Sequence, residues 1–150
     1  MYRDGLGVSV DGRRALYWFD RAAKQGSPDA YNAVGELYLG HSDVSEDVAE
    51  ARRFFLIGAT LDHAGAMYNL GLIYLAGRGV TQDEIQAYKW FTLAQAAAGE
   101  ERDSALGALT ALAERLTPVQ VGMAVTAANN WLRVTRRDLC EERCLAHAGL

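Results

Sequence analysis

Residues 66–94 read AMYNLGLIYLAGRGVTQDEIQAYKWFTLA, and this stretch decides the fold. Its first part, up to Ala76, repeats apolar residues at the three- and four-residue spacing of one helix face. Its second part does the same after Asp83, and the intervening Gly77-Arg78-Gly79 is typical of a turn. The stretch therefore predicts two helices joined by a short turn.

The same pattern recurs 36 residues earlier and, in weaker form, 36 residues later. The matching columns hold Tyr2, Tyr38 and Tyr74; Asp11, Asp47 and Asp83; Phe19, Phe55 and Phe91; and Gly35, Gly71 and Gly107. Self-similarity at a fixed period indicates a repeat architecture, in which each unit buries its apolar face against its neighbours. Because no long stretch alternates with period two, we expect an all-α fold, an α-solenoid of antiparallel helix pairs.

The period divides residues 1–132 into four parts. We expect a partial unit at 1–28, units at 29–64 and 65–100, and a degenerate capping helix pair at 101–132. The first helices of the pairs are predicted at 29–40, 65–76 and 101–116, and the second helices at 11–25, 47–61 and 83–98. The last pair has lost the repeated Tyr and Asp, which is typical of a terminal unit with a solvated outer wall. Residues 133–150 form a charged tail, expected to be helical at first and then frayed.

Glycines and polar residues are expected to shape the helices. Gly35, Gly71 and Gly107 lie inside predicted helices, where glycine costs about 1 kcal/mol relative to alanine, so we expect close approach of a neighbouring helix at each. The turn glycines are Gly5, Gly7, Gly40, Gly77 and Gly79. Asp47 and Asp83 are expected at helix N-termini. Thr81 with Glu84, and Thr117 with Gln120, fit the capping-box pattern.

The N-terminal edge is expected to be open. Met1 aligns with Leu37 and Ile73, so the chain begins inside a repeat. The helix at 11–25 then has an uncovered side that contains Trp18. We expect the natural protein to continue upstream, or another surface to cover this edge, which allows self-association.

Composition argues against several classes of function. The net charge is −4, the isoelectric point is about 5.3, and Lys24 and Lys89 are the only lysines, which disfavours a nucleic-acid binder. The uncharged stretch 116–132 is too polar and too short for membrane insertion, and no signal-peptide core opens the chain. We expect a cytoplasmic location by default, or a periplasmic or secreted one if a signal peptide precedes this sequence.

The repeated columns resemble the Sel-1-like repeat family, which is related to the tetratricopeptide repeat. The family pattern is carried by Ala66, Leu70, Gly71, Tyr74, Gly77, Gly79, Val80, Asp83, Ala87, Trp90, Phe91 and Ala94. The resemblance implies an α-solenoid that serves as a protein-interaction scaffold, often bacterial, in signalling, envelope or secretion contexts. Some members carry a disulfide within each repeat, but this chain has no cysteine there.

The resemblance also implies that the first helices line a concave groove. The residues expected to point into it are Asn32, Glu36, Tyr68, Leu72 and Ser104, and Leu39 and Leu75 are expected at its rim. An apolar patch beside polar side chains favours a peptide or helix anchor site. The alternative is that some of these residues pack into the adjacent unit.

Few residues are candidates for catalysis or for metal binding. Cys140, Cys144 and His147 would share one helix face, but a structural zinc site usually has four ligands and tighter cysteine spacing. We expect reduced thiols there, with no metal, no cofactor and no catalytic residue. The sequence thus favours a non-enzymatic scaffold that binds a segment of another protein. The alternatives are a small hydrolase of β-lactam or cell-wall-like substrates, with Ser104 needing a base, and a structural spacer within a longer repeat protein.

Overall fold

The computed structural model describes residues 12–40 and 46–147, and for residues 137–147 it describes the backbone alone. The described residues form helices and no strand, so the all-α prediction is confirmed. The helices are α1 (Gly12–Lys24), α2 (Pro28–Gly40), α3 (Val48–Thr60), α4 (Ala64–Ala76), α5 (Glu84–Ala96), α6 (Arg102–Ala113) and α7 (Pro118–His147). The bounds of α1 to α6 lie within three residues of those predicted from the repeat.

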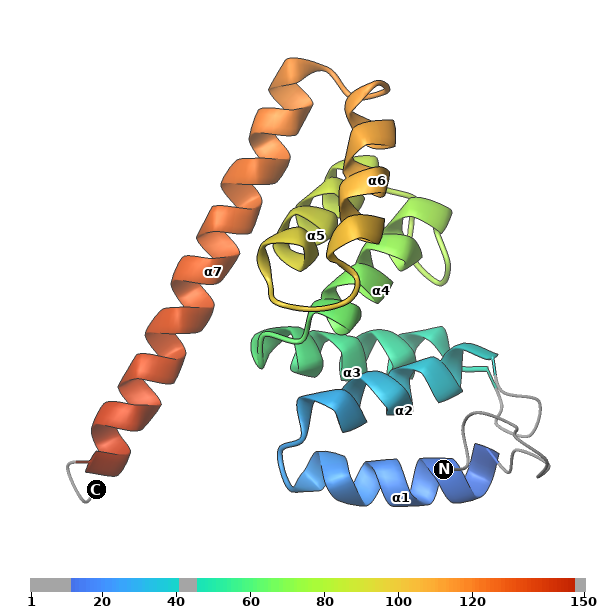
Figure 1. Ribbon diagram of the computed structural model, residues 1–150, viewed down its shortest axis with the longest axis vertical. Coiled ribbons are helices and arrows are strands. Elements are labelled where there is room, and N and C mark those ends of the chain that lie inside the picture. The colour runs from blue at the N-terminus through green and yellow to red at the C-terminus, as the bar shows by residue number, and fades with distance from the viewer. Residues whose placement is uncertain (1–11, 41–45, 148–150) are drawn as a thin grey trace.

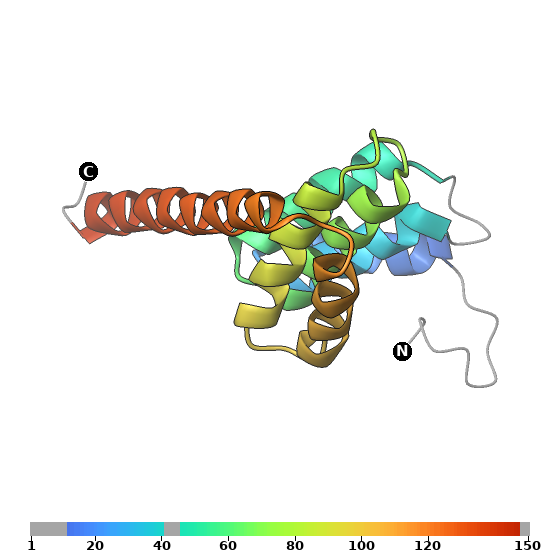
Figure 2. The same cartoon turned by 90° about the horizontal axis from the view of Figure 1, so that it is seen from above.

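The helices stack in chain order, as a solenoid requires. Each helix from α2 to α6 packs against the one before it, and α7 packs against α5. Figure 1 shows the stack rising from α1 at the bottom to α6 at the top. Seen from above, α7 projects well beyond the other helices (Figure 2). Because packing is confined to neighbours along the stack, this arrangement is the predicted α-solenoid.

Two glycines make room for buried rings. A Cβ added at Gly35 would lie 2.5 Å from Cε1 of Phe55, and one added at Gly71 would lie 2.6 Å from Cε1 of Phe91. Both rings are fully buried. Close packing at Gly35 and Gly71 is therefore confirmed, because a ring of the second helix lies directly on the backbone of the first.

The same expectation is wrong for Gly107, where an added Cβ would meet no atom within 4 Å. The column that holds Phe55 and Phe91 contains Ala127 in α7, so no ring reaches Gly107. Moreover, α7 packs against α5 instead of pairing closely with α6. The outer side of α6 is exposed and holds Asp103 and Thr110, in the columns of Met67 and Tyr74, together with Leu106, which is 51% exposed.

The last helix continues into the tail, whose first part was expected to be helical. α7 runs without a break from Pro118 to His147, so the boundary predicted after residue 132 lies inside a helix. Its predicted capping box is confirmed, because the Gln120 N–H donates to Thr117 Oγ1 at 3.3 Å and the Thr117 N–H donates to Gln120 Oε1 at 2.9 Å. None of the described helices is long and apolar enough to cross a membrane.

The other helix ends confirm the expected aspartate positions and correct one expectation. Asp47 and Asp83 cap α3 and α5 through their carboxylates, each of which accepts a backbone N–H at 3.0 Å. Since Asp83 is the cap and Glu84 is the first residue of α5, the capping box predicted from Thr81 does not form. Gly77 and Gly79 have positive φ as expected.

The remaining turn glycines divide into two groups. Gly40 is the last residue of α2, where the helix was predicted to end, and the residues that follow it, 41–45, lie outside the described residues. Gly5 and Gly7 lie outside the described residues.

The N-terminal edge is partly described. Trp18 on α1 is 55% exposed, and Leu16 and Phe19 are half-buried. Residues 1–11 lie outside the described residues, so self-association through this edge stays a prediction.

Side chains connect the first helices of the two central units, α2 and α4, near both of their ends. Near the start of α2 and α4, His63 Nε2 lies 2.9 Å from Asp29 Oδ1. Just past the end of α4, Arg78 donates to the Leu39 carbonyl oxygen at 3.1 Å and to Glu46 Oε1 at 2.8 Å. The relative position of the two units is thus set by polar contacts as well as by the core.

Candidate interaction surface

The predicted groove residues all lie on the first helices of the pairs, α2, α4 and α6. Asn32, Glu36 and Leu39 lie on α2; Tyr68, Leu72 and Leu75 lie on α4; Ser104 lies on α6. The stacking of α2 beside α4 brings the first six into one region, and Ser104 is exposed further along the stack.

A polar network joins α2 to α4. The Asn69 amide donates to Asn32 Oδ1 at 3.0 Å, and the Asn32 amide donates to Glu36 Oε1 at 3.0 Å. Asn32 is only 8% exposed, so its amide serves mainly to connect the two helices and to position the Glu36 carboxylate. Asn69 was not among the predicted groove residues, although it interrupts a column that otherwise holds Ala33 and Ala105.

The apolar residues among the predicted groove residues differ in how far their side chains are exposed to solvent. The Tyr68 ring packs at a tilt against Phe91, with ring centroids 5.4 Å apart, and Leu39 and Leu75 are half-buried against the core. Leu72 is 39% exposed. The surface therefore combines one well-exposed leucine with side chains that also contribute to packing between helices.

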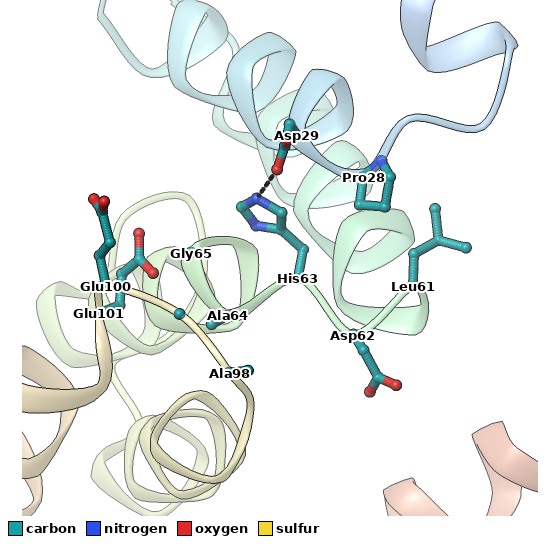
Figure 3. A pocket seen from close by; sticks show the side chains of 11 residues that line it. Pro28, Asp29, Leu61, Asp62, His63, Ala64, Gly65, Ala98, Glu100 and Glu101 are labelled. Atoms are coloured by element: carbon teal, nitrogen blue, oxygen red, sulfur yellow. Dashed lines mark hydrogen bonds and ion pairs between the residues drawn. The ribbon is translucent and has the colours of Figure 1, made fainter.

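A second feature is a pocket of about 400 Å³ at the turns that enter α2, α4 and α6 (Figure 3). Its lining includes His63 and the acidic residues Asp29, Asp62, Glu100 and Glu101. In Figure 3 the Asp29 carboxylate points to His63, whereas Asp62 points away from it. No residue of this lining carries a hydroxyl or thiol group.

Both ring nitrogens of His63 have structural partners. Nδ1 accepts the Ala66 N–H at 3.0 Å and so caps α4, which leaves Nε2 to donate to Asp29. The equivalent residue before α2 is Ser27, whose Oγ accepts the Ala30 N–H at 3.4 Å. A capping role for His63 was not predicted, and the serine in the equivalent column is the signal in the sequence that would have indicated it.

The described residues contain no group of three His, Cys, Asp or Glu side chains that could hold a metal ion. The side chains of Cys140, Cys144 and His147 lie outside the described part of the structure, although the backbone there belongs to α7.

Stacked helix pairs with a glycine–phenylalanine contact in each complete unit define an α-solenoid repeat protein. A family model, the Sel1 repeat, matches residues 1–27, 28–63 and 64–97. The chain belongs to the Sel1 repeat family.

Known proteins share this repeat within longer chains. The chain is 36% identical over 84 residues to the ERAD-associated E3 ubiquitin-protein ligase component HRD3B of Arabidopsis thaliana; the match covers 55% of this chain and 13% of that protein. It resembles the structure of c5321, a protective antigen of uropathogenic Escherichia coli strains with an SLR fold, at a TM-score of 0.75 and 26% identity. That likeness covers 85% of this chain and 27% of c5321. A Sel1 repeat protein from Oxalobacter formigenes matches at a TM-score of 0.57 and 25% identity, over 92% of this chain and 69% of its own.

Proposed function

We propose that this protein is a non-enzymatic scaffold that binds a segment of another protein along the first helices of its repeats. Membership of the Sel1 repeat family supports a role in protein interaction. The observation that carries the proposal is Leu72, an exposed leucine on α4 three residues after Asn69, which bonds to Asn32 of the polar network. An apolar side chain next to fixed polar groups is the usual composition of a peptide anchor site.

The chemistry of this surface suggests what the bound segment contains. Leu72 would contact an apolar side chain, and the half-buried Glu36 carboxylate would accept hydrogen bonds from backbone N–H groups or from a basic residue. Because Asn32 already bonds to Glu36 and Asn69, little reorganisation of this part of the surface is needed on binding.

Ser104, the nucleophile that the hydrolase alternative requires, is exposed and has no hydrogen bond to a basic or acidic side chain among the described residues. No observation favours the hydrolase alternative or the alternative that the chain is a structural spacer within a longer repeat protein.

Site-specific photo-crosslinking tests the proposal. A photo-reactive phenylalanine analogue placed at Leu72 should give a crosslinked partner in cells that make this protein. The same analogue at Val119, an exposed residue on α7, serves as the control and should not. Leu72→Asp in a tagged protein should then abolish capture of that partner with little change in melting temperature. Equal crosslinking at both positions, or undiminished capture by Leu72→Asp, would refute the proposed surface.

A further inference from the structure

The first helix of the stack carries one half of the repeated contact between a ring and a glycine. In each of the two central units, a ring of the second helix lies on a glycine of the first helix, as the fully buried Phe91 does on Gly71. Phe19 of α1 belongs to the column of Phe91, but it is only half-buried, and no described helix precedes α1. Among the described residues, Phe19 is therefore a ring without its glycine.

The sixth helix carries the other half of the same contact. A Cβ added at Gly107 would meet no atom within 4 Å, and the neighbouring Leu106 is 51% exposed. This face of α6 stays open because α7 packs against α5, where Trp131 meets Trp90 edge-to-face with ring centroids 5.3 Å apart. Gly107 is therefore a glycine without its ring, and α6 lies at the opposite end of the stack from α1 (Figure 1).

A cavity of about 450 Å³ lies beside this open face of α6. It is lined by Tyr88 of α5 and by Leu106, Leu109, Thr110, Ala113 and Glu114. Most of the side chains that α6 contributes are apolar, and all of them are exposed or half-buried. The surface next to Gly107 can therefore receive apolar side chains from another helix.

The register of a complete unit indicates which parts of α1 and α6 would meet. α4 and α5 run antiparallel, because the chain that follows α5 returns to the start of α4, where a Cβ added at Gly99 would lie 2.7 Å from the Cβ of Ala64. If Phe19 lies on Gly107 in the same antiparallel register, the last turn of α1 lies beside the first turn of α6.

These two helix ends carry opposite charges. The last turn of α1 holds Arg21 and Lys24, and the first turn of α6 holds Asp103. Within the described part of the chain, Arg21 and Asp103 have no partner of opposite charge, and Lys24 pairs with Asp20 of its own helix. Asp103 lies four residues before Gly107 and so shares its face of α6. Charge complementarity therefore favours the same register as the contact between ring and glycine.

We propose that copies of this chain associate end to end, with α1 of one copy packed on α6 of the next and Phe19 lying over Gly107. Leu16, three residues before Phe19, then faces the cavity beside α6. The two surfaces differ, so each copy that is added presents a free surface of the other kind, and the contact builds open chains. The second copy supplies α6 with the ring that α7 does not provide.

Sedimentation velocity over a range of protein concentrations tests the association. The mass should rise with concentration beyond that of a dimer and should fall towards that of the monomer at high salt, because salt screens the charged ends. Gly107→Leu should keep the chain monomeric, since its side chain occupies the place of the ring and its Cβ meets no atom of its own chain. The control, Asn129→Leu at an exposed position of α7, should associate like the parent chain. A parent chain that stays monomeric at every concentration, or equal association of the two leucine variants, overturns the proposal.

Charge reversal tests the register without altering the glycine. Arg21→Glu and Asp103→Lys should each weaken association severalfold, because each removes one side of the attraction between the two ends. A chain with both substitutions should recover most of the association, since α1 of one copy then offers the acid and α6 of the next offers the cation. Circular dichroism verifies that each variant is folded. Absence of recovery in the double variant shows that these ends do not meet and overturns the proposal.

Mixing two blocked variants tests the direction of the contact. A Gly107→Leu chain keeps the α1 surface of the parent, and a Phe19→Ala chain keeps the α6 surface. Each variant alone should be monomeric, and their mixture should form dimers with one copy of each and nothing larger. Assemblies larger than dimers in the mixture, or no dimer although circular dichroism shows both variants folded, overturn the proposal.

Discussion

Gly71→Ala tests how the repeat is packed. The added methyl group would lie 2.6, 2.7 and 2.9 Å from three atoms of the Phe91 ring, which is fully buried and cannot swing into solvent. Overpacking of this kind costs about 1–3 kcal/mol. The substitution also gains about 1 kcal/mol, because alanine favours the helix over glycine.

Gly107→Ala separates these two effects. Gly107 also lies inside a helix, but an added Cβ there would meet nothing within 4 Å, so only the gain in helix propensity applies. The difference in unfolding free energy between the two variants therefore reports the steric cost alone, about 1–3 kcal/mol. Urea denaturation followed by circular dichroism measures this difference. In thermal melts each kcal/mol should shift the midpoint by about 2–4 °C for a domain of this size.

A second substitution checks the cause. Phe91→Leu shortens the side chain that meets the new methyl group, so Gly71→Ala should cost less in that background than in the parent chain. If Gly71→Ala were as stable as Gly107→Ala, or if Phe91→Leu left its cost unchanged, the claim that the ring requires glycine would be wrong.

Three further outcomes follow from contacts elsewhere. His63→Ala should destabilise the protein by about 1 kcal/mol, because α4 loses its N-cap, and urea denaturation measures this. An unchanged unfolding free energy would contradict the claim that the imidazole is the group that caps α4. Trp131→Ala should expose Trp90 and speed amide hydrogen exchange in α7 more than in α2, and uniform exchange would contradict local docking of α7. Burial lowers the pKa of Lys89 from 10.5, so the unfolded chain binds more protons in the pH range just below 10.5 and stability attributable to this residue rises with pH there. Lys89→Met should remove that rise, and an identical pH dependence in the variant would refute it.

The repeat columns made most of the fold predictable. Recurrence of a glycine inside the helices predicted close packing at Gly35 and Gly71, and the structure then identified the rings that lie there as Phe55 and Phe91. The expectation of close packing at Gly107 was wrong because it was made without regard to the column of Phe55 and Phe91, in which Ala127 replaces the phenylalanine. A glycine in a column predicts close packing only when the ring that needs the space is also present.

Two other features of the structure, the length of the last helix and the polar network on the candidate surface, could not be read from the repeat columns. The full length of α7 agrees with the absence of glycine and proline between Gly122 and Gly149, whereas the division at residue 132 rested on charge. The network of Asn32 with Asn69 joins two helices with a separation of 37 residues, one more than the period. Contacts that do not follow the repeat cannot be found by aligning its columns, so the detailed composition of the candidate surface needed the structure.

The two polar contacts between α2 and α4 have a mechanical consequence. His63 with Asp29 lies at the start of the two helices and Arg78 with Glu46 lies just past the end of α4, so a rotation of α4 over α2 changes the distance within at least one pair. The Arg78 and Glu46 side chains are 44% and 56% exposed, so this pair opposes such a rotation by about 1 kcal/mol or less. The buried contacts of the helices therefore contribute most of the resistance to twisting, and the polar pairs add to it at the two ends.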